Sequence, residues 1–229
     1  MPSEPEHNGN FELLLEMAQP DLFRRNGFRL TELPVDSTTR DFGKRQQMVE
    51  MTGKTGMALP PGPSRVFALE ESKDAQQVRE AIHRLHDPQT RLVHEFFWFW
   101  PHALGQSRTD EALLALAQEN VNRAADIWHD QETNTTESHV STHNLAVLRH
   151  LTALDWESRA AAKPLSDAEK RQVQECWESA FRRWKMLLEH EAFWSRLTAR
   201  IRDLNDPRLT AGTARQIRSN LPLALMESN

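Results

Sequence analysis

The chain has 229 residues, of which 38% are hydrophobic and 27% are charged, a balance that is ordinary for a globular protein. Its formal net charge is −5, so it has no basic excess to neutralise a phosphate backbone, and this excludes nucleic acid as the expected partner. A single cysteine, Cys176, excludes an internal disulfide framework, fits a reducing compartment and is expected to be a small buried core residue.

The first segment, residues 1–10, is polar and acidic, and we expect it to be disordered. It lacks the basic and apolar regions of a secretory signal. No apolar run approaches the ~20 residues that a membrane helix needs. We therefore expect a cytoplasmic chain with no membrane partner.

Helical spacing of apolar residues predicts a helix over 11–23, followed by a turn at Asn26-Gly27 and a short apolar segment that ends at Pro34. Ser and Thr residues then offer N-caps for a helix over 38–51. The glycine- and proline-rich stretch 52–71 predicts a loop, and loops of that length are often functional.

The next helix carries an apolar stripe through Leu85 and is interrupted at Asp87-Pro88, because proline ends the turn before it. A second helical run is expected to continue through Phe96 to Trp100. Its end is the stretch EFFWFWP, which places five aromatic residues in a row in a chain that has no tyrosine.

Beyond residue 101 the sequence predicts helices throughout, and Ser166 with Glu169 forms the capping-box pattern at the start of one of them. No segment alternates as a strand does. We expect an all-α fold with a tail and short helix over 1–25, a helical hairpin module over 26–101 and a C-terminal helical bundle over 102–229. The bundle helices are expected at about 109–129, 139–160, 166–190, 191–204 and 211–226.

Two stretches of the middle segment resemble the J-domain of J-type co-chaperones. GFRLTELPVDSTTRDFGKRQQMVEM is similar to the opening of that family, and QQVREAIHRLHDPQTRLVHEF is similar to its third helix. The resemblance covers about a third of the chain, and the stretch from Leu85 to Arg91 is its most specific part. The positions that match the third helix are Ala81, Ile82, Leu85, Asp87, Pro88 and Arg91.

The resemblance implies a protein partner, with a chaperone ATPase of the heat-shock class as the candidate, but one departure limits it. The His-Pro-Asp tripeptide that stimulates the ATPase is absent, and its position falls near Lys54-Thr55-Gly56. We therefore interpret the segment as a degenerate J-like module that binds a partner without the usual stimulation. A looser similarity to bacterial proteins, in which such a module precedes a helical region, implies no function. The candidate partner-binding residues are Arg40, Lys44, Arg45 and Lys54.

The aromatic run lies where the predicted module meets the predicted bundle. Aromatic side chains bury large areas and dominate packing. We expect the C-terminal helices to cover the faces that the module leaves open; the alternative is an exposed patch for a partner chain. The residues of this predicted interdomain cluster are Phe96, Phe97, Trp98, Phe99 and Trp100.

A second functional class is a metal-binding or enzymatic helical protein that uses His139, His143 and His150, which share one helix face. The less specific interpretation is that these histidines are buried polar residues, and that His143 and Asn144 bond backbone at a helix crossing. A third possibility is a fragment of a larger assembly, because the chain ends in the apolar LPLALMESN. We favour a non-catalytic adaptor with no metal and no cofactor.

Overall fold

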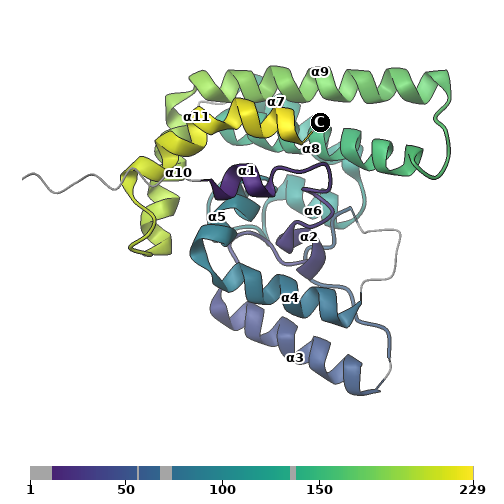
Figure 1. Ribbon diagram of the computed structural model, residues 1–229, viewed down its shortest axis with the longest axis vertical. Helices are drawn as coiled ribbons and strands as arrows, with labels where there is room; N and C mark the ends of the chain where they lie inside the picture. The colour runs from purple at the N-terminus through teal and green to yellow at the C-terminus, as the bar shows by residue number, and fades with distance from the viewer. Residues whose placement is uncertain (1–11, 56, 68–73, 135–137, 229) are drawn as a thin grey trace, which may run out of the picture.

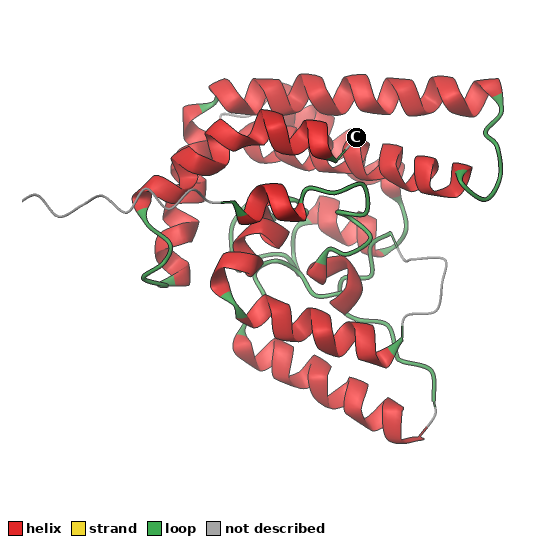
Figure 2. Cartoon of the chain, viewed as in Figure 1, coloured by secondary structure: helices red, strands yellow, loops and turns green. Residues whose placement is uncertain are grey.

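The computed structural model describes residues 12–55, 57–67, 74–134 and 138–228. Within these ranges the protein consists of eleven helices and no strand (Figure 2), which confirms the all-α prediction. The disorder expected for 1–10 lies outside the described residues. None of the helices in the described ranges has both the length and the apolar character required to cross a bilayer.

The helices form three layers (Figure 1). On one side α8 (Ser138–Ala160) and α9 (Asp167–Glu189) run against each other, with α7 (Val121–Asn134) packed on α8 and α11 (Ala211–Glu227) in the same layer. The middle layer holds four short helices: α1 (Leu13–Met17), α2 (Gly27–Thr31), α5 (Pro88–Phe96) and α6 (Glu111–Ala117). The hairpin of α3 (Thr39–Thr55) and α4 (Ala75–His86) lies on the opposite side, and α10 (Glu191–Leu204) precedes α11.

Several helix boundaries follow from local chemistry. Ser166 and Glu169 form the predicted capping box at the start of α9. Asp87 ends α4 in an extended conformation and then caps α5, whose first residue is Pro88. The interruption predicted at this dipeptide is therefore confirmed.

Several predicted helices differ from the structure, and α3 continues through Thr55 into the stretch 52–71 that was expected to be a loop. The helix expected over 11–23 is the much shorter α1, after which the chain turns. The single helix expected over 109–129 is two helices, α6 and α7, because Glu119 adopts a left-handed conformation with φ of 60°. The Asn120 N–H bonds back to the Ala115 carbonyl, and the Asn120 side chain accepts from Arg123 N in the first turn of α7.

The aromatic run is not helical throughout, contrary to the sequence interpretation. Helix α5 ends at Phe96, and residues 97–100 form a turn and a bend followed by irregular chain. This change of backbone explains how five consecutive rings are all buried, since a continuous helix would direct them around its whole circumference. Each of the five side chains is at most 3% exposed.

Rings from several helices enclose the run. Phe96 stacks on Trp184 of α9 at 5.7 Å between centroids, and Trp100 stacks on Phe193 of α10 at 5.5 Å. Phe99 lies nearly parallel to Trp128 of α7, also at 5.5 Å. The run therefore packs against the helices that follow it in the chain.

Side chains, instead of a helix, supply hydrogen bonds to the irregular backbone of the run. Asn144 of α8 accepts from the Trp100 N–H and donates to the Trp100 carbonyl, both at 2.8 Å. His143 Nε2 bonds the Phe96 carbonyl at 2.8 Å, and Asn26 Nδ2 donates to the carbonyls of His94 and Phe97. The predicted backbone bonding by His143 and Asn144 is thus confirmed, and it satisfies polar groups that burial would otherwise leave without partners.

Candidate protein-binding surface and adjoining pocket

Helix α3 leaves most of its surface uncovered. In the described part of the chain, α4 is the one helix that packs extensively against it, and α3 lies at the edge of the molecule (Figure 1). Phe42, Arg45 and Val49 form its buried stripe. The opposite side carries Arg40, Lys44, Met48 and Met51, which recur at three and four residues and so share one face. We call these four residues the α3 outer face.

The α3 outer face combines positive charge with exposed apolar surface. Met48 is 42% exposed and Met51 is 54% exposed, and Met57 just beyond the helix is 71% exposed. Methionine side chains are flexible and polarisable, and they are common on surfaces that bind other proteins. The prediction from the sequence named the basic residues of this helix as partner-binding and did not name its methionines. The spacing of the methionines, which places them opposite the buried stripe, could have identified them.

Of the predicted partner-binding residues, Arg40, Lys44 and Lys54 are exposed, but Arg45 is not. The Arg45 side chain is 2% exposed and donates to the Pro60 carbonyl at 2.7 Å and to Glu32 Oε2 at 3.3 Å. Arg45 therefore holds α3 to the loop that follows it, and the assignment of Arg45 to a contact surface is wrong.

The same contacts fix part of the long loop. Glu32 ends α2 in a left-handed conformation, and its carboxylate accepts from Gly62 N while its carbonyl accepts from Ser64 N at 3.0 Å. A Cβ on Gly62 would lie 2.6 Å from the Glu32 Cβ, so only glycine fits this close approach. Arg29 further anchors the loop by donating to the Phe67 carbonyl.

The position that corresponds to the J-domain tripeptide lies at the end of α3. Lys54 and Thr55 are the last two residues of the helix, and both are exposed. Gly56 lies outside the described residues. No histidine or aspartate stands at Lys54 or Thr55, so the chemistry of the family's tripeptide is missing there.

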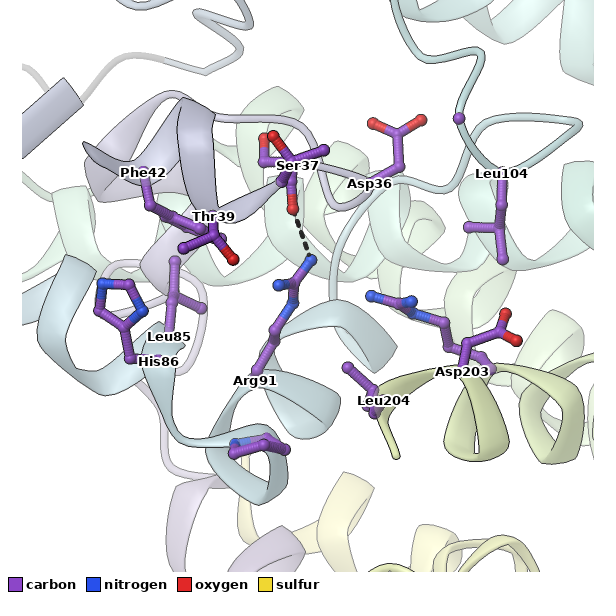
Figure 3. A pocket seen from close by; sticks show the side chains of 14 residues that line it. Asp36, Ser37, Thr39, Phe42, Leu85, His86, Arg91, Leu104, Asp203 and Leu204 are labelled. Atoms are coloured by element: carbon purple, nitrogen blue, oxygen red, sulfur yellow. Dashed lines mark hydrogen bonds between the residues drawn. The ribbon is translucent and has the colours of Figure 1, made fainter. Parts of the chain in front are cut away.

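A pocket of about 570 Å³ adjoins the start of α3 (Figure 3). Phe42, Leu85 and His86 line one side, and Leu104, Asp203 and Leu204 line the other, with Arg91 between them. Asp36 also lines the pocket, and its carboxylate accepts from Ser107 N at 3.0 Å. Sequence reasoning missed this pocket because its residues come from four separate segments.

The arginines of this pocket already have an acidic partner. Glu95, which is 2% exposed, accepts from Arg91 at 2.6 Å and from two nitrogens of Arg200 at 2.7 Å. Burial lowers the pKa of Arg200, but its hydrogen bonds to Glu95 outweigh that effect and leave the pKa raised. Arg91 also donates to the carbonyls of Val35 and Ser37. With these cations paired, Asp36 and Asp203 leave the pocket suited to a neutral or positively charged group.

The three histidines of α8 do not form one site. His143 bonds the Phe96 carbonyl, His150 Nε2 lies 3.2 Å from Ser228 Oγ, and the His139 ring packs 5.4 Å from that of His190. Burial lowers the pKa of His143 to about 4 and that of His150 to about 3, so both rings are neutral in water near pH 7. Across the described residues, no three His, Cys, Asp or Glu side chains are grouped as metal ligands.

Two other sequence expectations concern buried residues. Cys176 is buried as expected, and burial raises the pKa of its thiol, so the thiolate is disfavoured. In the apolar C-terminal segment, Leu221, Ala224 and Leu225 are buried within the chain itself, where α11 contacts α1 and α10. Leu223 and Met226 of the same segment are exposed.

Comparisons with known proteins identify no relative. No family model matches the sequence, and no curated protein and no solved structure matches the chain. The resemblance of residues 26–100 to a J-domain and the boundary at 101/102 therefore stay predictions from the sequence.

Proposed function

We propose that the chain is a non-catalytic adaptor that binds another protein through the α3 outer face. The observation that carries this proposal is the uncovered state of that face. Helix α3 is 17 residues long, and α4 is the one helix of the described protein that packs extensively against it, so the α3 outer face stays exposed. A helix that exposes large apolar residues beside basic ones presents a surface for another chain.

The chemistry of this face selects the kind of partner. Arg40, Lys44 and Lys54 are exposed on α3, and Glu50 is the one acidic residue of this helix in the exposed class. This local positive charge contrasts with the net charge of −5 of the whole chain. We infer that the partner presents an amphipathic helix with acidic residues, which pair with Arg40 and Lys44, and with apolar residues, which contact Met48 and Met51.

The J-like resemblance makes a chaperone ATPase of the heat-shock class one candidate partner. The order of short helix, helix, loop and helix in α2, α3 and α4 agrees with what the resemblance implies. The tripeptide is absent, so we expect binding without stimulation of ATP hydrolysis. Measuring the ATPase rate of such a chaperone with and without this protein tests that expectation, and a stimulated rate would contradict it.

A charge reversal tests the proposed surface. In affinity capture followed by mass spectrometry, the double variant Arg40→Glu with Lys44→Glu is expected to lose the partner that the unmodified chain retains. Arg45 stays unchanged, because its substitution would disturb the fold. Helix α9 offers a matched control, since Arg182, Lys185 and Met186 expose the same residue types on another face.

The control variant Arg182→Glu with Lys185→Glu is expected to retain the partner. A second pair, Met48→Ser against Met186→Ser, separates the apolar contribution from the charge. Equal retention of the partner by the α3 and α9 variants would remove the α3 outer face from consideration.

A further inference from the structure

A second cavity, away from the α3 outer face, is lined by residues of α1, of the segment after it, and of α4 and α5; α5 packs against both α1 and α4 (Figure 1). Its volume is about 230 Å³. Leu13, Met17 and Leu22 supply an apolar wall, while Arg25, Arg84 and His94 supply nitrogen donors. Thr90 also lines it, but its hydroxyl already donates to Asp87.

His94 contributes an unused donor. Its ring is 2% exposed, and Nδ1 accepts from Gly27 N at 3.3 Å, so the neutral ring carries its proton on Nε2. Nε2 is buried and has no hydrogen-bond partner. Burial, reinforced by the charges of Arg84 and Arg25, lowers the pKa of His94 to about 3, so the ring remains a neutral donor at physiological pH. Buried donors without partners are rare in native proteins.

Arg84 contributes a second unused donor on the same cavity. Its Nε is buried without a hydrogen-bond partner. Burial lowers the pKa of Arg84, the charge of Arg25 lowers it further, and Glu80 opposes the shift. An anion in the cavity would supply the acceptor that this buried donor lacks.

Three carboxylates lie near these arginines, but none of them accepts from Arg84 Nε or His94 Nε2. Asp21 pairs with Arg25 at 3.7 Å, and both side chains reach solvent. Glu80 lies within electrostatic range of Arg84, but no ion pair joins them. Glu16 lines the cavity and is exposed to solvent, and it forms no ion pair among the described residues.

We propose that this cavity binds a small carboxylate that carries an apolar body about the size of a benzene ring. The Arg84 guanidinium and the His94 Nε2–H would hold the carboxylate, and Leu13, Met17 and Leu22 would contact the apolar body. A cavity of ~150 Å³ accommodates benzene, so 230 Å³ leaves room for the attached carboxylate. Charge-assisted hydrogen bonds from a guanidinium are the strongest contacts available to such an anion.

Titration of the full chain with benzoate, its neutral isostere benzamide and inorganic phosphate, followed by calorimetry, tests the proposal. Benzoate is expected to bind at one site at least about tenfold more tightly than either other probe, since only benzoate offers both charge and ring. If benzamide binds as tightly as benzoate, the cavity recognises only the apolar ring. If phosphate binds as tightly, the cavity is a general anion site. Either result, or no binding of benzoate, overturns the proposal.

Substitutions test whether Arg84 and His94 hold the carboxylate. His94→Asn keeps an acceptor for Gly27 N and removes the Nε2 donor, and Arg84→Met keeps the apolar stem and removes the guanidinium. Each is expected to weaken benzoate binding at least about tenfold. Arg79→Gln on the exposed side of the same helix is the matched control and is expected to leave affinity unchanged. Glu16→Gln removes a like charge at the rim and is expected to strengthen binding.

Circular dichroism of each variant separates lost binding from lost structure. A folded His94→Asn or Arg84→Met protein that binds benzoate with unchanged affinity would place the ligand elsewhere and contradict the assignment. This test does not depend on the proposed function, because neither Arg84 nor His94 belongs to the α3 outer face.

Discussion

Replacing Asn144 with alanine should strongly destabilise the protein, although it removes only a small polar side chain. Asn144 is 1% exposed and makes two hydrogen bonds of 2.8 Å to the backbone of Trp100. Without it, one buried N–H and one buried carbonyl lose their partners. An unsatisfied buried polar group costs about 1–3 kcal/mol, so the variant should lose about 2–6 kcal/mol of unfolding free energy. Domain stabilities of ~5–15 kcal/mol make this a large fraction.

Urea unfolding followed by circular dichroism and tryptophan fluorescence measures this loss. With a slope of about 3 kcal/mol per M, the Asn144→Ala midpoint should fall by roughly 0.7–2 M. The control is Asn134→Ala, whose exposed side chain bonds only Asp130, and it should shift stability by about 0.5 kcal/mol or less. Equal midpoints for the two variants would refute the claim that Asn144 supports the irregular backbone of the aromatic run.

Three further predictions concern stability. The substitution Gly62→Ala should lower the free energy of unfolding by about 1–3 kcal/mol, because the added Cβ would collide with Glu32. The substitution Gly43→Ala should raise it by about 0.5–1 kcal/mol, because no atom lies within 4 Å of the added Cβ and alanine favours a helix. Similar thermal midpoints for the two variants would contradict this contrast. The buried histidines, with pKa values lowered to about 3 to 4, bind fewer protons folded than unfolded below pH 6.5. The free energy of unfolding should therefore fall as pH drops from 6.5 to 4.5, by about 2 kcal/mol for each of His94, His143 and His150, and a urea midpoint that does not change over that window would contradict this. A chain ending at Trp100 should not unfold cooperatively, because burial of Phe97, Trp98 and Trp100 is worth roughly 5–8 kcal/mol; a soluble, monomeric, cooperative fragment would reject that dependence.

Features with local causes could be predicted from the sequence. The capping box of Ser166 and Glu169 and the break at Asp87-Pro88 depend on residues close together in the chain. Likewise, the helical pattern without alternation established the all-α class. The pairing of His143 and Asn144 with backbone could be anticipated because polar residues on a buried helix need partners.

Features set by distant partners could not be predicted. Arg45 has the sequence context of a surface arginine, and its burial depends on Glu32 and Pro60, which are joined to it only by the fold. The break between α6 and α7 uses a left-handed Glu119, where neither glycine nor proline marks a turn. Both pockets escaped notice for the same reason, since their linings come from segments far apart in the sequence.

The aromatic run combines a feature that could be predicted from the sequence with one that could not. Its composition correctly drew attention to Phe96–Trp100, and the rings lie against α7, α9 and α10. The backbone was expected to stay helical, because nothing local to the run ends a helix before Pro101. The structure ends α5 at Phe96, where Asn26, His143 and Asn144 supply the hydrogen bonds that the helix would have made.

Site-specific photocrosslinking tests the central functional claim most directly. A photoreactive benzoyl-phenylalanine replaces Met48 on α3 in one protein and Met186 on α9 in another, two positions of similar exposure, 42% and 48%. The proposed adaptor function predicts one dominant crosslinked partner from position 48 and none above background from position 186. Equal adducts from both positions, or adducts from position 186 alone, would contradict a binding surface on α3.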